Sequence, residues 1–381
     1  MEKRYVRKKR WKKIVVNKND LVNNVKILKN ILNEKVKRTN SKGAKIIPVV
    51  KANGYGLDLV QYSKVLIECG IDILSIATFE EAEILINANL GVSILMLSPI
   101  NNETELEHLI ANDVILTIGS KENLDRAEKV AEKLGKDVLA HTKIDVGLGR
   151  YGFIYNDFEG IKYVYENAKR VKLVGIYSHM VNSVVKKSAE DEFSKFKKVL
   201  SFIEDNGYET GLRHICASRP FILYDEYILD AVRLGSIITG RTPFKVEGLK
   251  KVGEYETEIA EVKIVPKGHT ISYGAEFKAK KDMKIALIST GYIDGFVMGK
   301  QREVISFKTN VVEILKQIKN VFSKNKFKVL INDKSYDILG QVGMFHTAIN
   351  VDGTDVKTGD KVIIKDIHVT HINPNIRREY I

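Results

Sequence analysis

The stretch Pro48-Val49-Val50-Lys51-Ala52-Asn53-Gly54-Tyr55-Gly56 is an apolar run that ends on a lysine and then breaks into small and polar residues. The run starts at Ile46 and is rich in uncharged β-branched residues, which is typical of a strand buried on both faces. Only Pro48 disfavours this assignment, because proline has no N–H group to donate to a neighbouring strand. We therefore predict a buried strand over 46–50 that ends at Lys51.

A lysine at the inner end of a buried strand loses hydration, and this loss lowers the pKa of its amine. The neutral amine can attack a carbonyl carbon and form a Schiff base. A single lysine is more often exposed and has no such role. The residues that follow the other strands decide between these two interpretations of Lys51.

The composition limits the possible classes of protein. With 381 residues, 44% of them hydrophobic, the chain is long enough for two globular domains. It has no long apolar segment and no signal peptide, so we expect a cytoplasmic protein without membrane contact. Cys69 and Cys216 show no metal-ligand spacing, so we expect no metal site. The net charge of +13 is densest over 3–13; we interpret this segment as a solvated basic arm and expect no nucleic-acid partner.

Short apolar runs alternate with amphipathic stretches over the first 232 residues. This alternation predicts an α/β barrel of the TIM type with eight parallel strands. The expected strands are at 46–50, 73–76, 93–97, 114–118, 138–144, 173–177, 214–216 and 228–232. The expected helices include 19–28, 80–88, 121–134 and 190–206.

In such a barrel the residues that follow the strands meet at one end, where the active site lies. Here they carry an amine, guanidinium groups, an imidazole and hydroxyls, in Lys51, Arg150, His179, Ser218, Arg233, Gly235 and Ser236. The loops after the seventh and eighth strands commonly hold a phosphate. Ser218, Gly235 and Ser236 belong to these two loops.

From about residue 250 the helical spacing gives way to short alternating runs separated by glycines, which predicts a mainly β C-terminal domain. Its expected strands include 255–264, 283–288, 328–331 and 361–364. One segment, 309–322, spaces its apolar residues as a helix does, and we interpret it as a helical insertion. The predicted domains are 1–249, the barrel with its basic arm, and 250–381.

Several motifs together resemble the alanine racemase family of pyridoxal 5'-phosphate (PLP) enzymes, over nearly the whole chain. They are V-K-A-N-G-Y-G at 50–56, K-I-D-V-G-L-G-R at 143–150, His179, R-L-G at 233–235, I-S-Y-G-A at 271–275 and G-Y-I-D-G at 291–295. The resemblance implies a PLP-dependent isomerase that interconverts L- and D-alanine and supplies D-alanine for cell-wall peptidoglycan. It also implies a head-to-tail homodimer in which the two subunits share each active site.

Two bases are implied by the resemblance, one on each face of the substrate. Lys51 would hold PLP covalently and serve one face, and Tyr273 of the partner subunit would serve the other. An unperturbed tyrosine has a pKa near about 10, so as a base it needs nearby positive charge or hydrogen-bond donors. His179 and Arg233 are the candidates for this role.

The resemblance also assigns contacts with the cofactor and the substrate. The cofactor would be bound by Lys51, Tyr55, Arg150, His179, Ser218, Arg233, Gly235, Ser236 and Tyr380. Arg233 would meet the pyridine nitrogen and, because arginine does not readily give up a proton, would keep it unprotonated and limit transamination. The substrate would contact Arg150, Met344 and Tyr292. Lys143, a position often carbamylated in the family, would orient Arg150.

Four residues depart from the family's usual pattern: Phe345 replaces an aspartate, Gln341 an arginine, Ala217 an asparagine and Thr239 a tyrosine. None of these changes removes Lys51 or Tyr273, so they put the substrate in question more than the reaction. Two alternatives therefore stay open: a racemase of serine or another amino acid, and a PLP-binding homologue without turnover. A decarboxylase is less favoured, because it needs a cysteine in the β domain and both cysteines of this chain precede residue 250.

Overall fold

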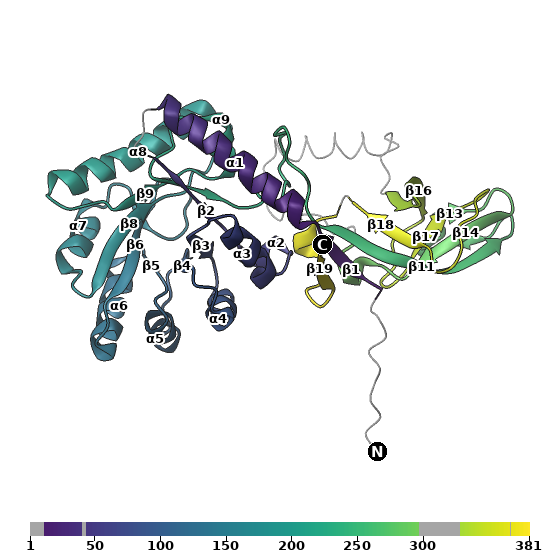
Figure 1. Cartoon of the computed structure of the whole chain (residues 1–381), viewed down its shortest axis with the longest axis horizontal. Helices are drawn as coiled ribbons and strands as arrows, with labels where there is room; N and C mark the ends of the chain where they lie inside the picture. The colour runs from purple at the N-terminus through teal and green to yellow at the C-terminus, as the bar shows by residue number, and fades with distance from the viewer. Residues whose placement is uncertain (1–10, 40–42, 297–327, 366) are drawn as a thin grey trace, which may run out of the picture. The chain divides into compact units, whose positions relative to one another are not determined.

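A computed structural model of the chain describes residues 11–39, 43–296, 328–365 and 367–381. The described residues form two compact units, Lys18–Val252 and 11–17 together with Gly253–Ile381 (Figure 1). The predicted boundary at residue 250 lies close to this division. The structure differs from the predicted domains at the strand near residue 13, which was assigned to the first domain. It belongs to the C-terminal unit, because it pairs with two strands there. The predicted helical insertion at 309–322 lies outside the described residues.

The unit Lys18–Val252 alternates strands with helices. Its strands are β2 (Lys45–Pro48), β3 (Ile73–Ile76), β4 (Ser93–Met96), β5 (Leu116–Ile118), β6 (Val138–Asp145), β7 (Phe153–Ile154), β8 (Val171–Tyr177), β9 (Leu212–His214) and β10 (Ala231–Leu234). Its helices are α1 (Lys18–Arg38), α2 (Lys51–Tyr55), α3 (Leu59–Glu68), α4 (Phe79–Ala88), α5 (Glu103–Ala111), α6 (Lys121–Leu134), α7 (Phe158–Asn167), α8 (Lys186–Asp205) and α9 (Ser218–Leu223). Helices α3 to α6 flank the strands β3 to β6 (Figure 1).

The strands of this unit pair in parallel. The paired strands are β2 with β10, β3 with β4, β5 with β6, β6 with β7 and β8, and β8 with β9. Isolated parallel bridges join Val49 to Ser75, Leu95 to Ile115 and Ala217 to Arg233. One apolar core cluster joins five strand regions and contains Ile47, Ile73, Leu95, Ile115 and Ala231. The parallel pairing confirms the predicted α/β domain, and the arrangement fits a TIM-like fold.

Helix α6 shows how the sequence determines where a helix begins and ends and which side chains it buries. Its N-cap Ser120 accepts a hydrogen bond from the Asn123 N–H, and Gly135 ends it in the left-handed conformation at φ 65°. Its buried side chains recur at helical spacing and face the strands. The predicted bounds, 121–134, are confirmed. No helix in the described ranges has the length and apolarity needed to span a lipid bilayer.

The unit formed by 11–17 and Gly253–Ile381 is mainly β. Its longer strands are β1 (Lys13–Val16), β11 (Glu254–Val265), β14 (Met283–Ile288), β15 (Lys328–Ile331), β16 (Lys334–Leu339), β17 (Thr347–Asn350), β18 (Lys361–Ile364) and β19 (Arg377–Tyr380). Two short strands, β12 (Thr270–Ile271) and β13 (Phe277–Lys278), form a hairpin around the 3₁₀ turn η1 (Tyr273–Ala275).

The strands of this second unit close into a β-barrel. The order β14-β17-β16-β15-β18-β11 returns to β14, which pairs with β11, and β1 and β19 extend the sheet beside β11. The predicted mainly β C-terminal domain is thereby confirmed. The bounds predicted for β14, β15 and β18 agree with the structure.

Candidate active site

A cavity of about 190 Å³ lies where the strands of the α/β unit end. The residues predicted to follow these strands come together in its lining, which contains Lys51, Tyr55, Lys143, Arg150, His179, Ser218, Arg233, Gly235 and Ser236. Its other lining residues include Tyr151 and Tyr177, which the sequence did not single out. The cavity is therefore built from segments up to 187 residues apart, Val49 to Ser236.

Lys51 opens a turn of unusual conformation. The strand predicted over 46–50 ends at Pro48, and the residues after Lys51 adopt left-handed angles, with φ between 53° and 63° from Ala52 to Tyr55. Asparagine and glycine, at positions 53 and 54, tolerate these angles. The expectation that Lys51 loses its hydration is wrong for this single chain, in which Lys51 is exposed at the cavity.

Hydroxyl and N–H groups gather on one wall of the cavity. The Gly235 N–H donates to Ser218 Oγ at 3.3 Å, and Tyr55 forms a hydrogen bond with the backbone of Ser236. A side chain at Gly235 would collide with the Tyr55 hydroxyl, so glycine is required there. Burial raises the pKa of Tyr55, which keeps its hydroxyl protonated and able to donate. These groups are typical of a phosphate site.

Arg233 is 3% exposed and has neutral partners. It donates to His214 Nδ1 at 2.6 Å, to the His214 carbonyl at 3.0 Å and to the Ser178 carbonyl, and it lies 3.4 Å from His179 Nδ1. Its guanidinium also lies 4.9 Å from the centre of the Tyr177 ring. Burial lowers the pKa of Arg233 to about 10, so it remains charged at neutral pH.

His214 also forms a hydrogen bond with a second buried histidine, His141. Its Nε2 lies 2.9 Å from His141 Nδ1. Because Arg233 donates to His214 Nδ1, we assign the ring proton of His214 to Nε2, which then donates to His141. Sequence reasoning missed this pair. The available signal was a histidine in each of two predicted strands, 138–144 and 214–216.

The lining of the cavity is strongly electropositive. Four basic side chains belong to it, Lys51, Lys143, Arg150 and Arg233, and among the described residues no aspartate or glutamate does. Burial, together with Arg150 and Arg233, lowers the pKa of Lys143 to about 7, and the same causes lower the pKa of His179 to about 3. The arrangement favours an anionic ligand.

The carboxylate of Asp145 stabilises the loop that carries Arg150. It accepts the N–H groups of Gly147 at 2.8 Å, Leu148 at 2.7 Å and Arg150 at 3.0 Å. The aspartate is therefore satisfied by the backbone. Within the described residues, no group of three or more histidine, cysteine, aspartate or glutamate residues could hold a metal ion.

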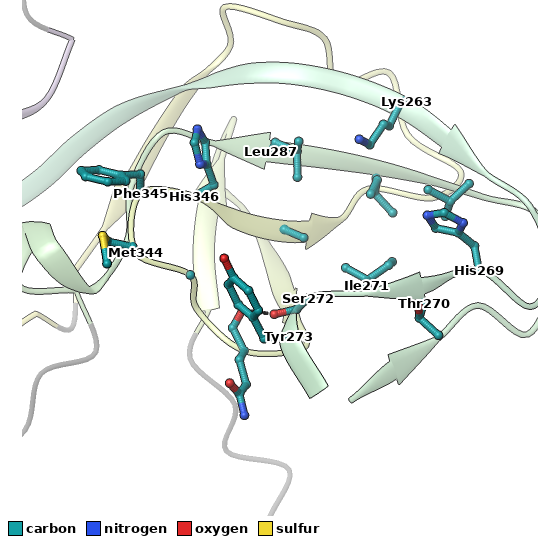
Figure 2. A pocket seen from close by; sticks show the side chains of 15 residues that line it. Lys263, His269, Thr270, Ile271, Ser272, Tyr273, Leu287, Met344, Phe345 and His346 are labelled. Carbon is teal, nitrogen blue, oxygen red and sulfur yellow. Dashed lines mark hydrogen bonds between the residues drawn. The ribbon is translucent and has the colours of Figure 1, made fainter. Parts of the chain in front are cut away.

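The β unit has a pocket of its own, of about 520 Å³. Figure 2 shows Tyr273 standing beside Ser272, with the Met344, Phe345 and His346 segment on the far side of its ring. Tyr273 is 76% exposed, and both Met344 and Phe345 are about half exposed. The second predicted base thus lies on an accessible surface, beside two half-exposed apolar side chains.

Two hydrogen bonds hold the turn that carries Tyr273. Ser272 Oγ donates to the Gln341 carbonyl at 2.6 Å, and Gln341 Nε2 donates to Glu276 Oε1 at 2.5 Å. Tyr292 opens the nearby 3₁₀ turn η2 (Tyr292–Asp294), and Tyr380 ends β19. Tyr273, Met344, Tyr292 and Tyr380 all belong to the β unit, so their approach to the cavity of the α/β unit stays a prediction.

Comparisons with known proteins agree with this division of the chain. Residues 16–243 match the family model "Alanine racemase, N-terminal domain", and residues 252–376 match "Alanine racemase, C-terminal domain". Alanine racemase 2 of Caldanaerobacter subterraneus is 30% identical over 364 residues, 92% of this chain and 84% of that protein. Alanine racemase of Methanococcus maripaludis is 34% identical over 278 residues, 71% of this chain and 74% of that protein.

Solved structures are similar over nearly their full length. The alanine racemase of Clostridium difficile 630 superposes with a TM-score of 0.83 at 24% identity, covering 97% of this chain and 96% of that one. The Bacillus anthracis alanine racemase with bound L-Ala-P gives a TM-score of 0.79 at 25% identity, covering 98% and 95%. Both domain matches, and the relatives that are at least 30% identical, show that the chain belongs to the alanine racemase family.

Proposed function

We propose that this protein is a PLP-dependent alanine racemase that interconverts L- and D-alanine and supplies D-alanine for the cell wall. The observation that carries the proposal is the cavity of the α/β unit. It places a lysine amine, a phosphate-type wall of hydroxyl and N–H groups, and three further cations around one space. PLP is an anionic aldehyde that needs each of these groups.

The residues present fit the cofactor. The amine of Lys51 would hold it covalently, and the phosphate would be bound by Tyr55, Ser218 and the N–H groups of Gly235 and Ser236, with Tyr380 as a further ligand. Arg233, which stays charged, would donate to the pyridine nitrogen, and His179 would lie beside the ring. When bound, PLP supplies an electron sink that stabilises negative charge at the substrate Cα.

Two groups of the protein would move the proton at Cα. The amine of Lys51 takes or returns it on one face, and the phenolic oxygen of Tyr273 of the partner subunit does so on the other. Arg150 would hold the substrate carboxylate, helped by the Met344 backbone and Tyr292 at the entrance. A proton removed on one face and returned on the other inverts the configuration.

Lys143 would support Arg150 after modification by carbon dioxide. With a pKa of about 7, roughly half of this amine is neutral at pH 7, and only the neutral amine forms a carbamate. The resulting anion would pair with Arg150 in a cavity whose described lining contains no aspartate or glutamate. A carbamate signal in ¹³C NMR with labelled bicarbonate, absent in Lys143→Met, tests this assignment.

We further propose that the eight strands β2 to β6 and β8 to β10 close into a (β/α)8 barrel that binds the cofactor, and that two chains associate head to tail. The pairing of β10 with β2 supports the closure. The exposure of Tyr273, Met344 and Phe345 supports the dimer, because a second copy would cover these large side chains.

A racemase of serine or another amino acid is the second candidate. It is favoured by the pocket of the β unit, in which Gln341 is engaged by Glu276 and Phe345 stands where the family has an aspartate. With Phe345 in place of an acidic side chain, an entrance of this kind would admit side chains other than methyl. A PLP-binding protein without turnover is not favoured, because it would have no use for Tyr273.

The test is optical. Purified protein with PLP is incubated with L-alanine, L-serine and larger L-amino acids, and the D-enantiomers are measured by chiral chromatography. We expect D-alanine to form fastest, and Lys51→Ala and Tyr273→Phe to lose racemisation. The proposal fails if the wild-type protein racemises none of them, or if Lys51→Ala keeps full activity.

A further inference from the structure

Glu81 is a buried carboxylate that does not line the cavity. It lies in the first turn of α4 and is 9% exposed. One of its oxygens, Oε2, accepts the N–H groups of Ala77 at 2.9 Å and Thr78 at 3.3 Å. These bonds, with the Thr78 hydroxyl accepting the Glu81 N–H, make a capping box at the start of α4.

The other oxygen of Glu81 makes a contact that capping does not require. Oε1 accepts the Ala52 N–H at 2.6 Å, 29 residues earlier in the chain and directly after Lys51. A charged, buried acceptor at this distance makes a strong hydrogen bond. The carboxylate therefore joins the end of the β3 region to the first residue of the left-handed turn.

That turn needs an external anchor. Ala52, Asn53 and Tyr55 have φ of 55°, 53° and 54°, where L-amino acids are disfavoured. Asn53 compensates by accepting the Leu59 N–H at 2.9 Å through its own side chain. Alanine has no such group, so its conformation depends on its backbone contacts.

The chain before Lys51 is held by the same neighbouring segment. The Val50 N–H donates to the Ser75 carbonyl at 2.8 Å, and Ser75 Oγ donates to the Pro48 carbonyl at 3.0 Å. Lys51 thus lies between two fixed points, one made by β3 and the other by Glu81 just beyond it. Together they set the direction in which the Lys51 side chain leaves the backbone.

We propose that Glu81 is a positioning residue for Lys51, because its carboxylate holds the left-handed turn at Ala52 and so aims the amine into the cavity. This inference rests on the proposed role of Lys51. Loss of the anchor lets the turn relax toward ordinary angles, and the amine then spends less time where the substrate proton lies. The effect falls on the rate of reaction more than on substrate binding.

Glu81→Gln prevents the two contacts from forming together. A glutamine has one acceptor oxygen and one NH₂ group, so it cannot accept from Ala77 and Thr78 and from Ala52 at once. Thr78→Ala is the matched control, because it weakens the same cap and leaves the bond to Ala52. Glu105→Gln is a second control, since Glu105 holds the equivalent position in α5, three residues after the N-cap Asn102.

Two readouts are used. Hydrogen exchange of peptides covering 50–57, followed by mass spectrometry in the cofactor-free protein, reports the turn itself. We expect it to be roughly tenfold or more faster in Glu81→Gln and unchanged in both controls. For the PLP-loaded enzyme we expect kcat to fall about tenfold to a hundredfold, with KM changed less than about threefold. Adding Ala52→Gly, which favours left-handed angles, should recover part of kcat.

The inference is overturned if Glu81→Gln and Thr78→Ala behave alike in both readouts while the wild-type protein racemises alanine. Failure of the proposed function is a different result, namely no racemisation by the wild type. If Glu81→Gln does not fold, Glu81→Asp takes its place, because the shorter side chain cannot keep both sets of contacts. Equal exchange over 50–57 in Glu81→Asp and wild type then also contradicts the inference.

Discussion

Three histidines lie within hydrogen-bonded reach of Arg233, either directly or through one another: His141, His179 and His214. Burial, and then the charge of Arg233, lowers the pKa of His141 and of His179 to about 3 and that of His214 well below its usual value. Such rings are neutral over the whole physiological range and act as hydrogen-bonding groups.

We predict that none of these three rings titrates between pH 8 and pH 5. Because each pKa is lower in the folded than in the unfolded state, the unfolded chain takes up more protons below about pH 6.5, and stability falls as the pH drops. Histidine NMR signals and urea unfolding at pH 7.5 and pH 5 measure both effects. A ring signal of any of the three with a midpoint near 6.5 would contradict the prediction.

Lys143 gives a pH effect of its own. Its pKa is about 7 in the folded state, against 10.5 for the free group, so folding is opposed by the cost of keeping the amine charged in its buried position. This destabilisation is complete below pH 7 and decreases as the pH rises toward 10.5. In buffer free of carbon dioxide, Lys143→Met should therefore stabilise the protein more at pH 7 than at pH 10. Urea unfolding of both proteins at each pH checks this, and an equal or larger gain at pH 10 speaks against it.

We propose that Arg233 sets the ratio of racemisation to transamination. A group that cannot release its proton keeps the pyridine nitrogen of the cofactor unprotonated and weakens the electron sink. We expect Arg233→Glu to release more pyruvate by transamination for each racemisation event, at a lower overall rate. Coupled pyruvate detection gives the ratio, with Arg233→Lys as the charge-preserving control. An unchanged ratio would remove this role from Arg233.

Elements with strong local signals were predictable from the sequence. The bounds of β3, β14, β15 and β18 agree with the predicted strands, since each is an apolar run that ends at polar or turn residues. Helix α6 was predicted because its cap, its period and its final glycine all agree. The convergence of Lys51, Arg150, His179 and Arg233 followed from the rule that active sites lie at the ends of parallel strands.

Other features depend on contacts that are distant in sequence. The strand predicted over 46–50 is two residues too long at its end, because beyond Pro48 the chain keeps only an isolated bridge between Val49 and Ser75. The seventh and eighth strands were misplaced by two or three residues, where the apolar runs are short. β1 was not predicted as a strand, since its partners β11 and β19 lie more than 230 residues away.

The cap of α6 provides a prediction about an element. Ser120 Oγ accepts the Asn123 N–H at 3.2 Å, so Ser120→Ala leaves that N–H without its partner and should cost about 1 kcal/mol of unfolding free energy. Ser120→Asp, which keeps an acceptor there, should stay close to the wild type. Urea unfolding at pH 7 distinguishes them. An alanine variant as stable as the aspartate variant would show that the cap contributes nothing.

At the scale of the whole molecule, each unit supplies half of the proposed chemistry. The α/β unit carries Lys51 in its cavity, and the β unit carries Tyr273 on an exposed surface beside Met344 and Phe345. In a head-to-tail dimer with a shared site, a site is complete only when one chain contributes the lysine and the other the tyrosine. This requirement makes the assembly testable by complementation.

The most direct measurement pairs two inactive variants in one dimer. Lys51→Ala and Tyr273→Phe chains carrying different tags are co-expressed, and the hybrid dimer is purified through both tags. One of its two sites then contains the intact lysine of one chain and the intact tyrosine of the other, so we expect about half of the wild-type racemase activity. A hybrid dimer no more active than either parent would contradict the shared two-base site.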